Sequence, residues 1–306
     1  MQAMPPKVTI IIPTYNRAAL LKIAMLSVLD CHYPNLECIV VDNASGADTT
    51  QVVEALQAQY PGQILYLRSE QNRGESSAIN WGLSKAQGEY LLTLSDDDFL
   101  LPNWFDISVP FMENHPDIIA AYPDWHIVDA QGRRIKTIYM VDYSFTRLFT
   151  TCANIPGPGV IIRKSAVMDM QHLRNPEYRY SPDYAMWLTL ATKGLFAHIP
   201  QVTACWRRHE KSLSVCANGY SKASEMETMI QHFISQHQAL PVVGDNSKKL
   251  KVRAFLHIVY VLCRGQDFYL AAKYACRAFL MSPYWVCVLA GCYMSRILRG
   301  SKRSSL

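Results

Sequence analysis

Short apolar runs alternate with amphipathic stretches along the first part of the chain. Runs that suit buried strands, rich in β-branched residues and bounded by polar or turn-forming ones, lie at residues 8–12, 36–41, 64–67 and 89–94. Helical periodicity separates them, over residues 17–28, 48–59 and 74–86. Strands that alternate with helices of this length form a parallel sheet covered by helices on both faces. The pattern therefore predicts an α/β fold with a mainly parallel, twisted sheet.

A polar segment follows each of these four predicted strands. The segments are Pro13–Arg17, Asp42–Asn43, Arg68–Gly74 and Asp96–Asp98. Ligands of open parallel α/β sheets bind outside the carboxyl ends of the strands. Because all four segments fall at that edge, we expect them to form one site.

The last of these segments consists of three adjacent aspartates, Asp96, Asp97 and Asp98, at the end of an apolar strand. Like charges at this spacing raise one another's pKa, so the carboxylates call for a neutralising partner. A hard divalent cation, Mg²⁺ or Mn²⁺, is the simplest one, because it binds carboxylate oxygens and completes its shell with substrate phosphates. The alternative is a solvated acidic turn that caps a helix starting near Pro102. The agreement of the strand ends favours the metal site.

The turn after the first strand excludes two common nucleotide-binding motifs. Residues 13–17 contain no glycine, so the GxGxxG fingerprint of a dinucleotide site is absent, and no GxxxxGK[ST] loop follows any predicted strand. A nucleotide here would depend on side chains, such as the aromatic face of Tyr15 and the carboxylate of Asp42. Taken singly, these residues are better explained as a packed loop aromatic and a turn aspartate. Only their shared location favours a ligand.

Beyond Trp104 the pattern predicts further strands, at residues 118–122, 126–128, 160–163 and 195–199. The turn over residues 129–133 is typical of a hairpin, with Gly132 supplying a positive φ. An amphipathic helix begins near Pro182, and Asp183 lies in its first turn. The helix N-terminus stabilises a carboxylate there, so Asp183 is either a capping residue or a functional one.

Composition and charge limit the classes of function. The 306 residues are 50% hydrophobic, enough for one large domain or a domain with an appendage. A net charge of +5, without basic residues interleaved with aromatics, argues against a nucleic-acid partner. The nine cysteines are scattered without a CxxC pair, so they predict neither a disulfide framework nor a zinc cluster. With no signal peptide before Pro13, we expect a cytoplasmic location.

The last part of the chain predicts a helical appendage. Helices are expected over residues 221–236, 248–262 and 266–280, and residues 278–295 carry no charge. Pro283 and Gly291 interrupt this apolar stretch, and basic residues flank both sides, which argues against a membrane-spanning helix. An interfacial helix on the inner face of the cytoplasmic membrane, formed within residues 266–303, and a buried appendage both fit. We place the domain boundary between residues 218 and 219, giving domains 1–218 and 219–306.

Ordered motifs in the first domain resemble those of a known family. The motifs are Ile11-Ile12-Pro13-Thr14-Tyr15-Asn16-Arg17, Ile39-Val40-Val41-Asp42-Asn43-Ala44-Ser45, Asn72-Arg73-Gly74, and Gly88-Glu89-Tyr90 through Asp96-Asp97-Asp98 to Leu101-Pro102. In order and spacing they resemble the nucleotide-binding half of a family 2 glycosyltransferase with a GT-A-type fold. The resemblance implies a nucleotide diphosphate sugar as donor, and Mn²⁺ or Mg²⁺ as cofactor.

The same resemblance implies roles for individual residues. Tyr15 and Asp42 would contact the nucleobase, Asp96 the ribose and Arg73 the diphosphate. The nucleotide site would be completed by Pro13, Thr14, Arg17 and Asn72. The metal ligands would be Asp97, Asp98 and His209. His209 lies in an Arg-x-His-x-x-Ser element of the family's type, although a lone histidine is more often structural.

Asp183 matches the first aspartate of the family's Glu-Asp-x-Asp pattern, which commonly acts as catalytic base. This chain has Pro182 and Ala185 at the flanking acidic positions. The implied reaction is an inverting transfer from a UDP-sugar, in preference to other donors, to a glycan, lipid-linked or other hydroxyl acceptor in surface or extracellular polysaccharide synthesis. Two other classes stay open. A non-catalytic sugar-nucleotide-binding scaffold is favoured by the changes beside Asp183, and a nucleotidyltransferase is disfavoured by the missing Gly-rich, Lys-bearing loop.

Overall fold

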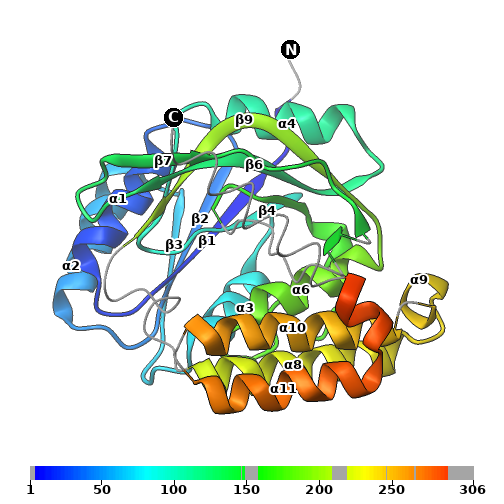
Figure 1. The fold of residues 1–306 in the computed structure, drawn as a ribbon. Coiled ribbons are helices and arrows are strands. Elements are labelled where there is room, and N and C mark those ends of the chain that lie inside the picture. Colours follow the sequence, from blue (N-terminus) through cyan, green and yellow to red (C-terminus); the bar gives the residue numbers. More distant parts are fainter. Residues whose placement is uncertain are drawn as a thin grey trace. The chain divides into compact units, whose positions relative to one another are not determined.

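The chain is described by a computed structural model in which two compact units are distinguished (Figure 1). The described residues are 4–145, 147–148, 158–208, 219–245, 247–264 and 267–288. The first unit, here called the sheet unit, comprises Met1–Tyr143, Asn154–Glu177 and Thr189–Ser212. The second, here called the helical unit, comprises Ser144–Ala153, Tyr178–Leu188 and Leu213–Leu306.

The first half of the sheet unit follows the predicted alternation of strands and helices. Its strands are β1 (Val8–Thr14), β2 (Leu36–Asp42), β3 (Ile64–Arg68) and β4 (Tyr90–Thr93). The helices between them are α1 (Ala18–Leu29), α2 (Ala47–Gln59) and α3 (Glu75–Lys85). The strand order is β3-β2-β1-β4, and every neighbouring pair is parallel. The predicted parallel sheet is confirmed for this half.

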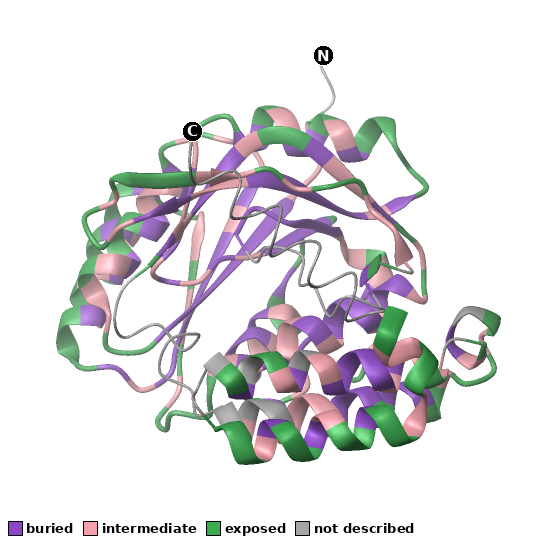
Figure 2. Cartoon of the chain, viewed as in Figure 1, coloured by how far each residue is buried: buried purple, intermediate pink, exposed green. Residues whose placement is uncertain are grey.

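Alternating side chains of these strands pack on opposite faces of the sheet. Ile10 and Ile12 belong to the core cluster that contains the buried residues of α1, α2 and α4. Ile11 and Val41 point to the other face, where a Cβ added at Gly82 of α3 would lie 2.5 Å from Ile11 Cγ2. A parallel sheet covered on both faces is buried along its whole length, which explains the near-continuous burial of β1 and β2 (Figure 2).

The second half of the sheet unit is mixed rather than parallel. Its elements are β5 (Phe99–Leu100), α4 (Trp104–Asn114), β6 (Ile118–Val128), β7 (Arg134–Ile138), β8 (Ile161–Arg163), the 3₁₀ turn η1 (Lys164–Ala166) and β9 (Leu195–Arg207). The order continues from β4 as β8-β6-β9-β5, with β7 on β6. Among the described strands of this half, β6 and β9 pair in parallel, and the pairs β4–β8, β6–β8, β5–β9 and β6–β7 are antiparallel.

One strand, β6, replaces the two strands predicted at residues 118–122 and 126–128. The intervening residues stay in the sheet because the register with β9 shifts on both sides of Asp124, and such irregularities accommodate a proline such as Pro123. The polar Asp124 is satisfied inside the sheet by His198 Nε2 at 2.8 Å and by the Met140 amide at 2.7 Å. The predicted hairpin is confirmed, and Gly132 has a φ of 83°.

The helical unit contains the predicted C-terminal helices. They are α8 (Gly219–His237), α9 (Pro241–Gly244), α10 (Ser247–Arg264) and α11 (Phe268–Met281). Helix α6 (Pro182–Ala191) begins in this unit. Val252, Phe255 and Leu262 of α10 form a core cluster with Tyr274 and Ala278 of α11. Within the described ranges, no helix combines the length and the apolar character that crossing a membrane requires.

Candidate functional site

Strand register brings the predicted polar segments of the sheet unit together. Thr14, the last residue of β1, pairs with Asp42, the last residue of β2, and Asp42 pairs with Arg68, the last residue of β3. On the other side of β1, the amide of Leu94 donates to Ile11 O at 3.0 Å, which directs the aspartates after β4 to the same edge. The convergence predicted from the strand ends is therefore present in the fold.

Arg17 neutralises two of the three adjacent aspartates. Its Nη1 lies 2.9 Å from Asp96 Oδ1 and 3.1 Å from Asp97 Oδ2, and Thr14 Oγ1 donates to Asp96 Oδ2 at 2.7 Å. Burial raises the pKa of Asp96 to about 6, although Arg17 and the Thr14 hydroxyl lower it. Burial lowers the pKa of Arg17, but the charges of Asp96 and Asp97 outweigh it and raise the pKa overall.

Asp98 is directed into the protein. It is 4% exposed, and its Oδ1 accepts the Arg207 amide at 2.9 Å. Burial and the neighbouring Asp97 raise its pKa well above the usual value. Helix α4 begins at Trp104 with Asn103 as its N-cap, so Asp98 does not cap it. Because Asp96 and Asp98 are both buried, the alternative of a solvated acidic turn is wrong.

Arg207 also supports the aspartate loop with its side chain. Its Nε donates to Asp97 O at 2.9 Å, its Nη1 donates to Ala130 O at 2.9 Å, and the guanidinium lies over the ring of Phe99. The residue is 4% exposed. Arg207 therefore ties β9 to the loop that carries the aspartates.

Asp42 is fully buried, and the chain uses both of its carboxylate oxygens. Oδ1 accepts the Ser45 amide at 2.8 Å, and Oδ2 accepts the Tyr66 hydroxyl at 2.7 Å. Arg68 Nε lies 3.6 Å from Oδ2. Sequence reasoning did not identify Tyr66 or Ser45. For Tyr66, the two-residue period of a strand could have served as a signal, because it places Tyr66 on the same face of β3 as Arg68.

The loops after β1 and β2 hold strained backbone at the site. Asn16 and Ala44 have φ angles of 54° and 66°, in the left-handed region that non-glycine residues rarely adopt. The loops support each other, because the Asn16 amide donates to Ser45 Oγ at 2.9 Å. Asn43 Nδ2 donates to Gly74 O at 3.2 Å, and this bond connects the loop after β2 to the loop before α3.

Three predicted nucleotide-site residues are open to solvent at this edge. Tyr15 is 47% exposed, and Asn72 and Arg73 are exposed. Pro13, by contrast, is buried within β1. The edge thus combines accessible aromatic, amide and cationic groups with buried carboxylates.

The donor set fits a cation that is shared with a substrate. In the described part of the chain, no three His, Cys, Asp or Glu side chains form a group that could hold a metal ion by themselves. Mg²⁺ and Mn²⁺ at phosphate sites need only one or two carboxylates, because phosphate oxygens and water supply the other ligands. Asp97, the most accessible of the three aspartates, is suited to that role; Asp98 offers only the oxygen that does not accept the Arg207 amide.

The structure does not bring every predicted residue to this edge. Asp183 lies in the first turn of α6 and belongs to the helical unit, so its relation to the aspartates stays a prediction. His209 lies outside the described residues.

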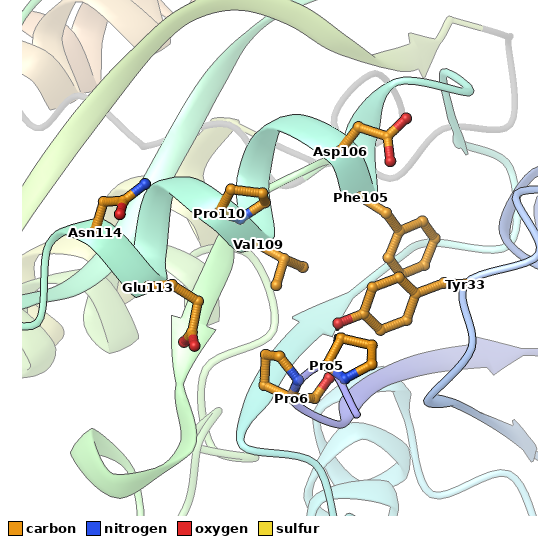
Figure 3. Close-up of a pocket in the computed structure, with 9 residues that line it drawn as sticks. All are labelled: Pro5, Pro6, Tyr33, Phe105, Asp106, Val109, Pro110, Glu113 and Asn114. Carbon is orange, nitrogen blue, oxygen red and sulfur yellow. Dashed lines mark hydrogen bonds between the residues drawn. The ribbon is translucent and has the colours of Figure 1, made fainter. Parts of the chain in front are cut away.

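A separate apolar hollow of about 350 Å³ lies at the opposite end of β1, beside the residues that precede it (Figure 3). Pro5 and Pro6 form one side, and Phe105 and Val109 of α4 form the other. Tyr33 stacks on Phe105 with ring centroids 4.7 Å apart and donates its hydroxyl to Pro6 O. The hollow contains none of the predicted site residues.

A mixed α/β sheet in this order, flanked by helices and with an acidic segment at its carboxyl edge, has the architecture of the GT-A type. The chain belongs to glycosyl transferase family 2, whose model matches residues 9–170, more than half of its length. This confirms the family and fold that the sequence motifs predicted.

Solved structures and curated relatives agree with this assignment. S. aureus TarS 1–349 in complex with UDP-GlcNAc superposes with a TM-score of 0.63 at 15% identity, covering 89% of each chain. The mannosyltransferase PcManGT from Pyrobaculum calidifontis, in complex with GDP-Man and Mn²⁺, gives 0.61 at 16% identity, covering 96% of this chain and 81% of the other. At this identity the likeness shows the fold.

Two relatives illustrate the similarity in sequence. An uncharacterized glycosyltransferase of Rickettsia bellii is 26% identical over 220 residues, which cover 71% of this chain and 31% of the relative. The GalNAc(5)-diNAcBac-PP-undecaprenol beta-1,3-glucosyltransferase of Campylobacter jejuni is 38% identical over 96 residues, 31% of each chain. The chain spans about a third to a half of the length of the first curated relatives that it matches.

Proposed function

We propose that the chain transfers a sugar from a nucleotide diphosphate sugar to an acceptor hydroxyl, with inversion at the anomeric carbon. One observation carries the proposal: the ends of β1, β2, β3 and β4 gather Asp42, Arg17, Asp96 and Asp97 at one edge of the sheet unit. A nucleotide diphosphate offers a base with N–H donors, ribose hydroxyls and phosphates. Carboxylates can accept hydrogen bonds from the N–H and hydroxyl groups, a cation can bind the phosphates, and an exposed aromatic ring can stack on the base.

In this proposal each group of the donor has a partner in the sheet unit. Tyr15 stacks on the base. Asp42 accepts from the base N–H through a lone pair that the Ser45 amide and the Tyr66 hydroxyl leave unused, so the base must reach an otherwise buried carboxylate. Asp96 accepts from a ribose hydroxyl, and Arg73 attracts the diphosphate. Asp97 and Asp98 would hold Mn²⁺ or Mg²⁺. The bound cation would neutralise the charge that develops on the leaving diphosphate.

Asp183 is proposed as the base that takes the proton of the acceptor hydroxyl as the sugar is transferred. Attack by the hydroxyl oxygen forms the new glycosidic bond while the bond to the diphosphate breaks, so one displacement inverts the anomeric carbon. No covalent enzyme intermediate is needed. Support comes from the position of Asp183 in the first turn of α6 and from its place in the sequence, which resembles the family's Glu-Asp-x-Asp pattern.

Asp183→Asn tests the catalytic assignment. We expect transfer to fall by about 10²–10⁴-fold while donor affinity stays within twofold, because a general base contributes to the chemical step alone. Asp267→Asn is the matched control, since Asp267 also lies at a helix start and accepts the Leu270 amide at 3.1 Å. Wild-type transfer by Asp183→Asn would refute its role. If the unsubstituted protein binds nucleotide sugars without turnover, the result would support a non-catalytic scaffold. Release of pyrophosphate would support a nucleotidyltransferase.

The donor we propose is a UDP-sugar, and TarS, which has the same fold, was crystallised with UDP-GlcNAc. Thermal unfolding with UDP, GDP, CDP and dTDP sugars, with and without Mn²⁺, tests this. Ligands that bind only the folded state raise the midpoint. The largest shift is expected with a UDP-sugar and Mn²⁺, and a larger shift with GDP-mannose would overturn the assignment.

The acceptor and location that we propose follow the relatives. The Campylobacter jejuni relative is named for an undecaprenol-linked glycan, so we propose a glycan, lipid-linked or other hydroxyl acceptor in surface polysaccharide synthesis. Peripheral binding at the inner face of the cytoplasmic membrane, through residues 266–303, is supported by exposed apolar side chains on and after α11: Phe268, Tyr269, Phe279, Leu280 and Tyr284. Sedimentation with anionic and with neutral vesicles tests this. The protein should sediment with the anionic vesicles, and protein that stays in the supernatant with both kinds of vesicle would contradict the proposal.

A further inference from the structure

One carboxylate of the helical unit accepts hydrogen bonds from three consecutive backbone amides. Glu225 Oε2 accepts from Arg179 N at 2.6 Å, and its Oε1 accepts from Tyr180 N and Ser181 N, both at 2.7 Å. These amides belong to the segment that leads into α6. Glu225 itself lies on α8, 44 to 46 residues further along the chain.

The local sequence explains why this segment needs an external acceptor. Ser181 O accepts the Ala185 amide at 3.2 Å, so the helix starts here, and the amides that precede it have no carbonyl partner within the helix. Pro182 has no N–H, so it cannot contribute to an anion-binding turn. Three successive N–H groups that point to one carboxylate form a backbone nest, and their bonds are charge-assisted.

A second pair of side chains ties the same segment to α8. Tyr178 is buried, and its hydroxyl lies 3.0 Å from His232 Nδ1. His232 follows Glu225 by two turns of helix, so both side chains project from the same face of α8. Residues 178–181 are thus anchored to α8 at both ends.

We propose that Glu225 is the positioning residue for Asp183, which lies two residues beyond the last amide that Glu225 accepts. By fixing the backbone of residues 179–181, Glu225 sets where α6 begins and therefore where the Asp183 carboxylate projects. Pro182 precedes Asp183 and carries no acidic group, and the carboxylate that accepts the amides of this turn comes from α8. The role of Asp183 rests on the proposed function, whereas the anchoring by Glu225 does not.

Amide hydrogen exchange tests the anchoring without any assay of activity. In the unsubstituted protein, the amides of Arg179, Tyr180 and Ser181 should exchange slowly although they lie outside a helix. In Glu225→Gln they should exchange about tenfold or more faster, because each loses a charge-assisted bond. Exchange at the rate of a free loop in the unsubstituted protein would overturn the proposal, and this measurement needs no variant to fold.

Glu227→Gln is the matched control. Glu227 lies on the same helix, but it accepts the Tyr274 hydroxyl at 2.8 Å and pairs with Arg277, both on α11. This variant loosens the packing of the helices without touching residues 179–181. Slow exchange of those amides is expected to persist in it. Equal acceleration in both variants would assign the protection to general stability and overturn the proposal.

Kinetics test the positioning role. In Glu225→Gln we expect kcat to fall by about ten- to hundredfold, the size of loss that a displaced catalytic group causes, with the KM of the donor unchanged. Glu225→Asp, which keeps the charge, should recover part of the loss. Unchanged kcat together with released amides would refute the positioning role. Absence of transfer by the unsubstituted protein would count against the proposed function instead, and the exchange result would still decide the anchoring.

Discussion

Replacing Arg17 by Gln should destabilise the sheet unit, because Arg17 is the cation that neutralises Asp96 and Asp97. The guanidinium is 31% exposed, whereas Asp96 is 5% exposed, so the pair lies between a surface and a buried ion pair. Surface pairs contribute about 0–1 kcal/mol, and removing one partner of a buried pair costs about 3–5 kcal/mol. We therefore expect a loss of about 2 kcal/mol in the free energy of unfolding, which corresponds to a Tm lower by about 4 °C.

The loss should depend on pH in a defined direction. The pKa of Asp96 is about 6 in the folded protein, above the value of about 3.9 in an unfolded chain. The folded state therefore binds more protons between these values, and stability falls as the pH rises from about 4 to about 6. Arg17 opposes this fall because it lowers the pKa of Asp96. The difference between Arg17→Gln and the unsubstituted protein should be largest at pH 8 and shrink below pH 6.

Thermal and denaturant unfolding with a chelator present measures this difference at pH 5 and pH 8. Arg133→Gln is the control: its pair with Asp129 is 78% exposed on the arginine side, and its removal should change the Tm little. Addition of Mn²⁺ should stabilise Arg17→Gln more than the unsubstituted protein, because the Asp97 carboxylate then no longer pairs with Arg17 and can bind the cation. A variant as stable as the parent at pH 8 would refute the reasoning.

Two further substitutions test the packing behind the site. Gly82→Ala should cost about 1–3 kcal/mol in denaturant unfolding, because the new Cβ would lie 2.5 Å from Ile11 Cγ2. At Gly46 the nearest atom to a new Cβ is Asn16 Oδ1 at 3.9 Å, so Gly46→Ala should cost less than about 1 kcal/mol, the preference for glycine over alanine at the N-cap of α2. Tyr66→Phe should cost about 1–3 kcal/mol and weaken UDP binding in a titration, because it removes the hydroxyl that donates to buried Asp42; unchanged stability and affinity would contradict this.

The parallel half of the fold and the convergence of its polar strand ends were predictable from the sequence. Apolar runs with clear polar limits define β1 to β4, and the rule that ligands bind at carboxyl ends of strands then selects Asp42 and Asp96 without any contact being known. The mixed half was less predictable. Asp124 interrupts an apolar pattern, and its partners, the Met140 amide and His198 far along the chain on β9, let β6 continue through it.

The partners of the carboxylates could not be predicted, because local pattern carries no information on them. Arg17 and Asp96 are 79 residues apart, and the contact between Glu225 and Tyr180 joins residues 45 apart. Such pairs depend on how elements pack after they form. The candidate side chains can be named from the sequence, but the contacts between them are known only once the tertiary structure is.

The strand order of the sheet unit has a consequence for how the chain folds. β1 lies at the centre of the parallel half, yet its neighbour β4 is separated from it by α1, β2, α2, β3 and α3, with Val8 paired to Tyr90. Closing so long a loop is slow, whereas α10 and α11 pair as adjacent helices and make mostly local contacts. During synthesis, β1 therefore leaves the ribosome well before β4, and its edge on that side stays open until β4 has been made. This interval is when the nascent chain is most exposed to aggregation.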